Sequence, residues 1–291
     1  MENKIKQKLY SKYKKYLARY FRLSSYPYVS GDTFRDFSKF IYDEYTSFNP
    51  ENLKNKDIVF VKTDLLEDYF KYVHPKIKVK YILLSHNSDE IINSQHKKYL
   101  DSKIIHWFAQ NLVEEFADNV SVIPIGLENR WYLNNGRLRN LKRFENDKYE
   151  KDFLVLSAFN PETNKERFAL LQSLKNNDLI DKPEIDNKTQ YLDFVSKSKF
   201  VLCPEGNGPD THRVWESLLF ESIPVMKESK FTKILEKSDV PILTLNNWSE
   251  IKDLDSEILN NFYEQNKVRF KSNKYSYFSF WENKINQYLD E

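Results

Sequence analysis

The chain contains almost no cysteine and no long apolar run, and each shortage excludes a class of protein. Cys203 is the one cysteine among 291 residues, so the fold cannot rest on an intramolecular disulfide framework, and a reducing compartment is expected. No apolar run approaches the ~18 residues of a membrane span, and no signal peptide is visible. The sequence therefore predicts a cytoplasmic protein, free or at the inner face of the membrane.

Charge is nearly balanced over the whole chain, with one exception at the amino terminus. Lys and Arg number 45 against 43 Asp and Glu, a net charge of +2, so no overall basic field predicts a nucleic-acid partner. Residues 2–22 hold eight basic residues and one acidic residue, and apolar side chains from Ile5 to Tyr20 recur at helical spacing. This predicts a basic amphipathic helix, which either makes a peripheral contact with an anionic membrane or packs on the body with its basic face in solvent.

From residue 26 onward, apolar runs alternate with helical stretches, as in the βαβ units of a parallel sheet. The expected strands are residues 28–29, 58–61, 81–84, 104–108, 120–125, 153–157, 200–203, 223–226 and 241–245. Residues 130–151 are rich in Asn, Arg and Lys without an apolar period, which predicts a linker or an active-site flap. The sequence thus predicts two α/β units whose strands end in small or polar residues, at the edge where such sheets bind ligands.

The segment from Lys199 to Met226 is the most informative part of the chain. An apolar strand at residues 200–203 leads into a loop that holds Gly206 and Gly208, two of only five glycines. Glycine permits positive φ and the close approach of backbone N–H groups to a ligand. Either Asp210 or Thr211 can cap the helix that follows, and the unpaired N–H donors of a helix N-terminus favour phosphate. The segment therefore predicts an anion site.

The polar side chains of that helix suit a nucleotide diphosphate. Arg213 lies in the first turn, and Glu216 lies about 4.5 Å further along the axis. Arg213 would pair with phosphate oxygens, and Glu216 would accept from the two hydroxyls of a ribose. His212 either donates to a phosphate or caps the loop. The alternative is an ordinary βαβ crossover with an Arg–Glu pair at the surface.

The segment resembles the donor-binding motif of exostosin-like glycosyltransferases of GT-B architecture. The resemblance rests on about 28 residues, with Pro204, Asp210-Thr211-His212-Arg213, Trp215-Glu216 and Ile223-Pro224-Val225 at the matching places. It implies a GT-B-like α/β fold, with two Rossmann-like domains whose mostly parallel sheets face a central cleft. The implied donor-binding residues are Gly206, Asn207, Gly208, Asp210, Thr211, His212, Arg213 and Glu216. One departure is Glu221, since the family commonly has glycine there, and a glutamate at positive φ would be strained by roughly 1 kcal/mol.

The expected organisation follows from that architecture. Residues 1–140 would form the acceptor-side domain, residues 150–272 the nucleotide-sugar-binding domain, and residues 273–291 a helix that crosses back to the first domain. The expected activity is inverting, metal-independent transfer of a sugar from a nucleotide-diphosphate sugar to a glycan or lipid-linked saccharide, with no further cofactor. The alternatives are a nucleotide-sugar-binding protein, or an enzyme that modifies the nucleotide sugar without transferring it.

Inverting transfer also needs a base that takes the proton of the acceptor. Candidates at the strand ends of the first domain are Asp32, Asp64, His86 and Asp89. The loop of residues 85–89 is favoured, because it follows the most apolar strand of this domain, which is therefore expected to be central. Asp89 is the first choice, His86 the second and Asp32 a further candidate; alternatively, Asp89 caps the next helix.

The aspartate triplet, the cysteine and most of the histidines are expected to have structural roles, although such residues bind metals or catalyse reactions in other proteins. The Asp253-Leu254-Asp255 triplet resembles a metal-binding motif of other transferases but lies in a predicted helix, so a surface or capping role is expected. Cys203 and His106 are expected in the core, and His74 and His96 at the surface. No histidine pair has the spacing of a zinc site, so no metal ligands are predicted.

Overall fold

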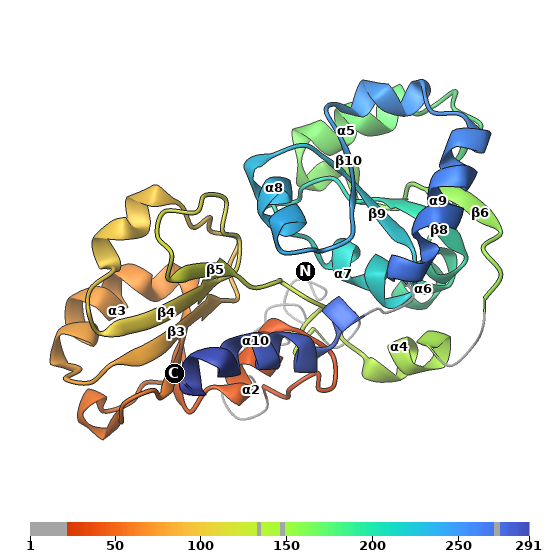
Figure 1. Cartoon of the computed structure of the whole chain (residues 1–291). Helices are drawn as coiled ribbons and strands as arrows, with labels where there is room; N and C mark the ends of the chain where they lie inside the picture. Colours follow the sequence, from red (N-terminus) through yellow and green to blue (C-terminus); the bar gives the residue numbers. More distant parts are fainter. Residues whose placement is uncertain (1–21, 133–134, 146–148, 271–273, 291) are drawn as a thin grey trace, which may run out of the picture.

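The computed structural model describes residues 22–132, 135–145, 149–270 and 274–290 (Figure 1). Within these ranges, ten strands form two sheets of five strands each, and the strand pairs are parallel. Parallel sheets need helical crossovers that cover their faces, which explains the alternation of apolar runs and helices along the chain. The predicted fold class, two Rossmann-like α/β domains, is confirmed. The amino-terminal helix predicted for residues 2–22 lies almost wholly outside the described residues.

The first sheet has the order β1-β2-β3-β4-β5, and it defines the first domain. Its strands are β1 Phe40–Tyr42, β2 Ile58–Lys62, β3 Tyr81–His86, β4 Ile104–Ala109 and β5 Val120–Val122. All six residues of β3 are buried, because a central strand is covered on both faces and paired on both edges. The prediction that this strand is central is confirmed. Its carboxyl end therefore lies in the middle of the sheet edge, where ligands of such folds bind.

The second sheet has the order β10-β9-β8-β6-β7, with β8 at its centre, and it defines the second domain. Its strands are β6 Phe153–Leu156, β7 Ile180–Asp181, β8 Ser198–Leu202, β9 Ile223–Lys227 and β10 Leu243–Leu245. The α-helices within the described ranges are α2 Gly31–Phe37, α3 Leu66–Tyr72, α4 Leu138–Glu145, α5 Lys165–Ser173, α6 Lys188–Ser196, α7 His212–Leu219, α8 Lys230–Lys237, α9 Ser256–Phe270 and α10 Phe278–Asp290. The short 3-10 helices are η1 Pro50–Asn52, η2 Thr63–Leu65, η3 His74–Lys76, η4 Ser94–Tyr99, η5 Pro161–Thr163, η6 Trp248–Lys252 and η7 Lys274–Ser276. The predicted strand, loop, helix and strand of residues 199–226 are therefore present as β8, its loop, α7 and β9.

Three expectations about local structure need correction. The strand expected at residues 28–29 makes only isolated bridges, in which Tyr28 pairs with Tyr277 and Ser30 with Gly126. The edge strands β1 and β7 were not expected, because they are only three and two residues long. Residues 130–151 are more than a linker, since they contain α4.

Helix α10 lies against the first domain, although it follows the second domain in the sequence (Figure 1). The ring of Phe278 packs 5.3 Å from Phe34 of α2, and the ring of Tyr288 packs 4.0 Å from His106 of β4. Toward the second domain, the ring of Trp281 in α10 lies 6.0 Å from the ring of Trp215 in α7. These contacts place α10 between the two domains. The exact domain boundaries drawn from the sequence remain predictions.

Helix α7 ends at a residue with unusual backbone geometry. Glu221 has φ of 58°, a conformation that glycine adopts at little cost and that strains other residues. The N–H of Ser222 donates to the carbonyl of Ser217 over 2.9 Å, which closes the helix end. The positive φ suggested by the departure from the family pattern is therefore present, and the chain accepts it with a glutamate.

Candidate functional site

A cleft of about 740 Å³ lies where the two domains meet. The second domain supplies most of its walls, from the loops that follow β6, β7 and β8 and from the first turns of α6 and α7. The first domain contributes Asp89 and Ile125, and Asn135 follows from the connection between the domains. The volume is typical of a small-molecule site, and its position at strand carboxyl ends is the one expected for α/β folds.

The N-terminus of α7 opens into this cleft with polar groups that lack partners. Thr211 is the N-cap residue, but its side chain makes no capping hydrogen bond. Its hydroxyl is buried, as is that of Ser157 after β6, and neither has a hydrogen-bond partner among the described residues. Both residues line the cleft. Because buried polar groups are nearly always paired in folded proteins, these two hydroxyls indicate a ligand.

Two guanidinium groups lie beside the same helix end. Arg213 donates through Nε to the carbonyl of Ala158 over 3.1 Å. Arg167, on α5, is buried, and its Nε and Nη2 donate to the carbonyls of Glu205 and Pro204 over 2.7 and 3.0 Å. Burial, and then the nearby charge of Arg213, lower the pKa of Arg167 to about 10. No described carboxylate forms an ion pair with either group, so an anion would stabilise both.

Glu216 lies deeper along α7 and is almost fully buried at 2% exposure. Its Oε1 forms an ion pair with Nζ of Lys188, the first residue of α6. The Lys188 ammonium also lies 4.5 Å from the centre of the Tyr191 ring, over which the Arg213 guanidinium stands at 5.9 Å. Glu216 thus lines the cleft as predicted, with one carboxylate oxygen already paired.

The two glycines of the loop after β8 lie close to atoms of other segments. A Cβ at Gly208 would lie 3.0 Å from Nδ2 of Asn111 and 3.2 Å from the carbonyl oxygen of Asp89, both in the first domain. A Cβ at Gly206 would lie 3.1 Å from Nη2 of Arg167. Gly208 lines the cleft, as does its neighbour Asn207. The missing side chain at Gly208 therefore allows the two domains to approach each other.

Asp210 also joins the domains rather than facing a ligand with free oxygens. Its Oδ2 accepts from the backbone N–H of Ile125 over 2.6 Å, and its Oδ1 accepts from Nε1 of Trp215 over 2.8 Å. Burial raises the pKa of this carboxyl to about 7. The expectation that Asp210 binds the donor directly is therefore weakened, because both oxygens already have partners and Thr211 takes the N-cap position.

A second cavity of about 450 Å³ adjoins the cleft on the side of the first domain. It lies at the carboxyl ends of β2 and β3, and its lining includes Lys62, Asn129 and Tyr132. Three residues line both spaces: Asp89, Ile125 and His212. Ligands in the two spaces would meet at this shared wall.

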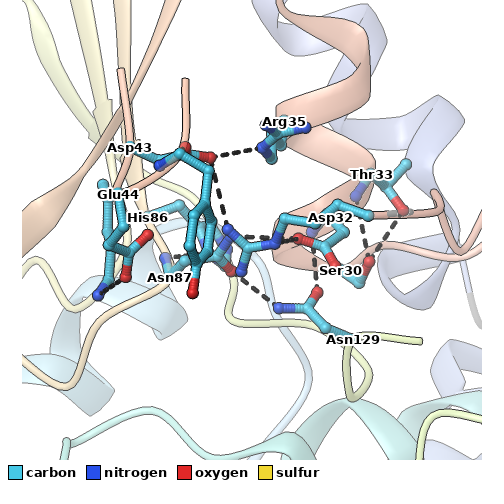
Figure 2. Close-up of polar contacts among 12 residues, drawn as sticks. Ser30, Asp32, Thr33, Arg35, Asp43, Glu44, His86, Asn87 and Asn129 are labelled. Carbon is cyan, nitrogen blue, oxygen red and sulfur yellow. Dashed lines mark hydrogen bonds and ion pairs between the residues drawn. The ribbon is translucent and has the colours of Figure 1, made fainter. Parts of the chain in front are cut away.

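The predicted bases occupy different places relative to this wall. Asp89 is exposed and has no side-chain hydrogen bond within the described residues, and the next helix, η4, is capped by Asn93 instead. Asp64 lines the second cavity and lies 3.2 Å from Nζ of Lys62. Asp32 is buried behind the cavity, where its Oδ1 lies 3.2 Å from Nε of Arg22 (Figure 2). Of these carboxylates, Asp89 alone borders both spaces.

His86 is fully engaged by the backbone. Its Nε2 lies 2.8 Å from the carbonyl oxygen of Pro124, so this nitrogen donates. Its Nδ1 accepts from the N–H of Asn87 over 2.6 Å, and both residues are labelled in Figure 2. Burial lowers the pKa of His86 to about 4. The structure argues against His86 as the base, because its one free lone pair is already used inside the fold.

The remaining sequence expectations fall outside the site. Oδ1 of Asp255 accepts from the N–H of Ile258 over 2.7 Å, as expected of a cap at the start of α9. Cys203 and His106 are buried as predicted. His74 was expected at the surface but is buried, with Nδ1 2.8 Å from the hydroxyl of Tyr81. Across the described ranges, no group of three or more His, Cys, Asp or Glu side chains is arranged for a metal ion, and no helix is long and apolar enough to cross a membrane.

Several residues at the site were not singled out from the sequence. These residues are Lys188, Glu128 and Arg167. Lys188 follows Asn187, which caps α6 after β7, so recognition of that short edge strand would have placed it at the ligand edge. Glu128 follows the predicted strand of residues 120–125 and so lies at the ligand edge as well, but its contact with His212 depends on the approach of the other domain.

Comparison with known families places the best-defined similarity in the second domain. A family model described as the RXYLT1 C-terminal domain matches residues 155–289, which include the segment of residues 199–226 and all but the last residue of α10. A search of curated proteins by sequence finds no match. The family similarity therefore covers the part of the chain that supplies most of the cleft.

Solved structures with a related arrangement share little sequence with this chain. The pneumococcal O-GlcNAc transferase GtfA in complex with UDP and GlcNAc is 10% identical with a TM-score of 0.43, over 83% of this chain and 58% of that one. The Methanocaldococcus jannaschii UDP-GlcNAc 2-epimerase in complex with UDP-GlcNAc and UDP is 15% identical with a TM-score of 0.35, over 70% of this chain and 69% of that one. The N-terminal domain of Candida albicans trehalose-6-phosphate phosphatase is 11% identical with a TM-score of 0.43, over 82% and 71%. This chain spans 59% of the length of the matched chain in the GtfA/B complex and 58% of GtfA.

Proposed function

We propose that this protein is a glycosyltransferase that takes a sugar from a nucleotide-diphosphate sugar. The observation that carries the proposal is the N-terminus of α7, where Arg167 and Arg213 lie without a carboxylate partner beside the buried, unpaired hydroxyls of Ser157 and Thr211. A diphosphate has the charge and the oxygen acceptors to satisfy these groups together with the free N–H groups of the helix.

The rest of the cleft fits the nucleoside of such a donor. The ion pair of Glu216 and Lys188 lies next to the anion site, and the second carboxylate oxygen of Glu216 can accept from a ribose diol. Beyond it, the loop after β7 lines the cleft with Pro183 and Ile185, which offer apolar surface for a base. The matched family is xylosyltransferase-related, which supports the same class of reaction and makes a pentose donor worth testing.

The proposed reaction takes place at the wall shared by the two cavities. The acceptor, a hydroxyl of a glycan or lipid-linked saccharide, would occupy the second cavity and attack the anomeric carbon from the side opposite the diphosphate, with inversion. Asp89 borders both spaces, and we assign to it the removal of the acceptor proton. The leaving diphosphate is stabilised by Arg213, Arg167 and the helix N-terminus, so the proposed mechanism uses no metal ion or further cofactor.

A panel of nucleotide sugars gives the first test. UDP-xylose, UDP-glucose, UDP-N-acetylglucosamine, GDP-mannose and the free nucleotides would be added singly while the melting temperature of the full chain is measured. A ligand present at about 100 times its dissociation constant stabilises the folded state by about 2.7 kcal/mol, which is readily seen as a shift. The donor found in this way is then incubated with saccharide acceptors.

The release of nucleoside diphosphate separates the possible activities. Release that depends on an acceptor supports transfer, whereas equal release without an acceptor indicates hydrolysis. Binding without any turnover of the bound sugar across the acceptors would leave a nucleotide-sugar-binding protein. If no member of the panel shifts the melting temperature, the proposed donor site is wrong.

A further inference from the structure

His212 connects the two cavities, and the first domain holds its imidazole ring. It is the first residue of α7 and lines both the cleft and the second cavity. Its Nδ1 lies 2.7 Å from the carbonyl oxygen of Gly126, and its Nε2 lies 3.4 Å from Oε1 of Glu128. Both partners belong to the loop after β5. The orientation of this second-domain side chain is therefore set by the first domain.

Both partners of this ring can only accept hydrogen bonds. A backbone carbonyl has no proton to give, so Nδ1 of His212 carries a proton and donates it to Gly126. In a neutral ring, the lone pair of Nε2 would then face the carboxylate of Glu128, which is repulsive, whereas a charged ring donates to it. Burial opposes the charge, but the Glu128 carboxylate raises the pKa of His212 to about 9. The geometry and the charge of the partner both favour an imidazolium.

Glu128 is itself held in place for this contact. The N–H of Asn129 donates to the same oxygen, Oε1, over 3.2 Å, and the side chain is largely buried at 18% exposure. Burial would favour the neutral acid, but His212 holds the pKa of Glu128 below its usual value. The oxygen that meets the imidazole is thus fixed by the backbone and ionised by its partner.

Among the described residues, no other titratable group around His212 takes the place of Glu128 as its direct partner. The groups near the imidazole are Glu216, Asp210 and Arg213 of its own helix and loop, and His86 and Asp89 of the first domain. Lys188 of α6 acts on the partner instead, since its charge lowers the pKa of Glu128. His86 is neutral at physiological pH, since burial lowers its pKa to about 4. Glu216 is already paired with Lys188. Glu128 is therefore the carboxylate in direct contact with the ring.

We propose that Glu128 is a positioning residue for sugar transfer, which holds the His212 imidazole as a cation beside the diphosphate site. The inference rests on the proposed glycosyltransferase function. In the step, a bond forms between the acceptor oxygen and the anomeric carbon, and the bond from that carbon to the diphosphate oxygen breaks. The electron pair leaves with the diphosphate, and the acceptor proton goes to the base. His212 keeps both of its protons and offsets the negative charge that develops on the leaving group.

The consequence is that the cationic site is complete only when the domains are in contact. Arg213 and Arg167 belong to the second domain, whereas the charge of His212 depends on a loop of the first domain. A donor bound to an open form would therefore lack one cation.

The direct test is an NMR titration of the His212 ring in the full chain. The chain has five histidines, so the signal can be assigned by its loss in His212→Gln. We expect His212 to titrate at about 9 in the wild type. In Glu128→Gln the pKa of His212 should fall well below its wild-type value, because burial opposes the charged ring and the carboxylate that offsets it is gone, and Glu128→Asp should restore part of the shift. A wild-type value near the ordinary one, or no change in Glu128→Gln, overturns the proposal.

The functional readout is the pH dependence of turnover with the donor identified by thermal shift. At pH 8, Glu128→Gln should lose about tenfold or more in kcat, with a smaller change in the KM for the donor. The loss should shrink as the pH falls below the pKa of His212 measured in the variant, because the ring then regains its proton. An equal loss at every pH would mean that Glu128 has a structural role only, and would also overturn the proposal.

A matched control is Glu115→Gln, which removes another ion pair between the domains. Glu115 pairs with Lys237 of α8, but both side chains are about half exposed or more, and neither lines the cavities. This variant should change neither the His212 titration nor the pH profile. A wild type that turns over no nucleotide sugar would count against the proposed function alone, because the NMR titration still shows whether Glu128 holds the imidazolium.

Discussion

Two regions of the molecule, the surroundings of Asp43 in the first domain and the N-terminus of α7 in the second, treat their buried polar groups in opposite ways. In the first region, the carboxylate of Asp43 is fully paired. Its Oδ2 accepts from Nε of Arg35 over 2.7 Å (Figure 2), and its Oδ1 accepts from the N–H groups of Tyr45 and Thr46 over 2.9 and 2.8 Å. In the second domain, Ser157 and Thr211 carry buried hydroxyls that no described residue satisfies.

This difference separates groups that stabilise the fold from groups that are available to a ligand. A closed network such as that around Asp43 offsets the desolvation of its buried charges with hydrogen bonds and ion pairs inside the domain. The unpaired hydroxyls at the N-terminus of α7 have no such partners among the described residues, and in the proposed function an anion supplies them. We therefore expect substitutions in the first network to act on stability, and substitutions around α7 to act on binding and turnover.

The largest expected effect comes from Arg213→Ala, which removes a cation from the open site. We expect kcat/KM to fall by on the order of 10³-fold, because charge-assisted contacts to a leaving group are among the strongest in such sites. The free energy of unfolding in the absence of ligand should change by less than about 1 kcal/mol, or rise through relief of repulsion with Arg167. Initial rates and urea unfolding measure the two effects. Arg139→Ala, at an exposed position of α4, is the control.

The opposite pattern is expected for Asp43→Asn in the first domain. The substitution leaves Arg35 and Arg22 beside a neutral amide, so the free energy of unfolding should fall by about 3 kcal/mol, while the folded fraction keeps its turnover. A large loss of turnover with unchanged stability would contradict the assignment of Asp43 to stability and of the residues around α7 to binding and turnover.

The same carboxylate predicts a dependence of stability on pH. Burial would raise the pKa of Asp43, but its hydrogen bond and ion pair with Arg35 hold it below 3.8. Its contribution to stability is therefore present above pH 3.8 and is lost as the pH falls through the lower pKa of the folded state. Urea unfolding between pH 3 and 6 should show a steeper decline for the wild type than for Asp43→Asn.

Asp89→Asn sharpens the comparison at the wall between the two cavities. Because Asp89 is exposed and unpaired, the variant should fold and bind the donor normally, yet lose turnover by ~10²-fold or more. Asp64→Asn serves as the contrast, since Asp64 lines only the second cavity. If Asp64→Asn loses the turnover and Asp89→Asn keeps it, the base is Asp64.

The smallest expected effect concerns the end of α7. Glu221→Gly replaces a residue at φ of 58° with the one that adopts this conformation freely, so the free energy of unfolding should rise by up to about 1 kcal/mol. Glu236→Gly within α8 is the reverse control and should lower it by about 1 kcal/mol. A decrease in stability for Glu221→Gly would show that the glutamate side chain contributes more than its backbone costs.

Much of the fold could be predicted because it depends on local patterns. The apolar runs at residues 58–61 and 81–84 became β2 and β3, and the strand, loop and helix around Arg213 are present as expected. The failures are the shortest elements, which hold too few residues to show a period. The short edge strands β1 and β7 take their structure from the neighbouring strand, and Tyr28 pairs with a residue near the other end of the chain.

The candidate site also combines features that follow from local sequence patterns with features that depend on contacts between the domains. The sequence by itself determined the α/β architecture, the helix that follows the glycine loop and the placement of Arg213 and Glu216 on that helix, because each follows from a pattern within a few residues. Only the tertiary structure decided that Asp210 binds the backbone of Ile125, that Gly208 meets Asn111, and that Glu128 holds His212. Each of these pairs is separated by more than 80 residues and lies between the two domains. Contacts of that kind depend on how whole sheets approach each other, which no local pattern of residues contains.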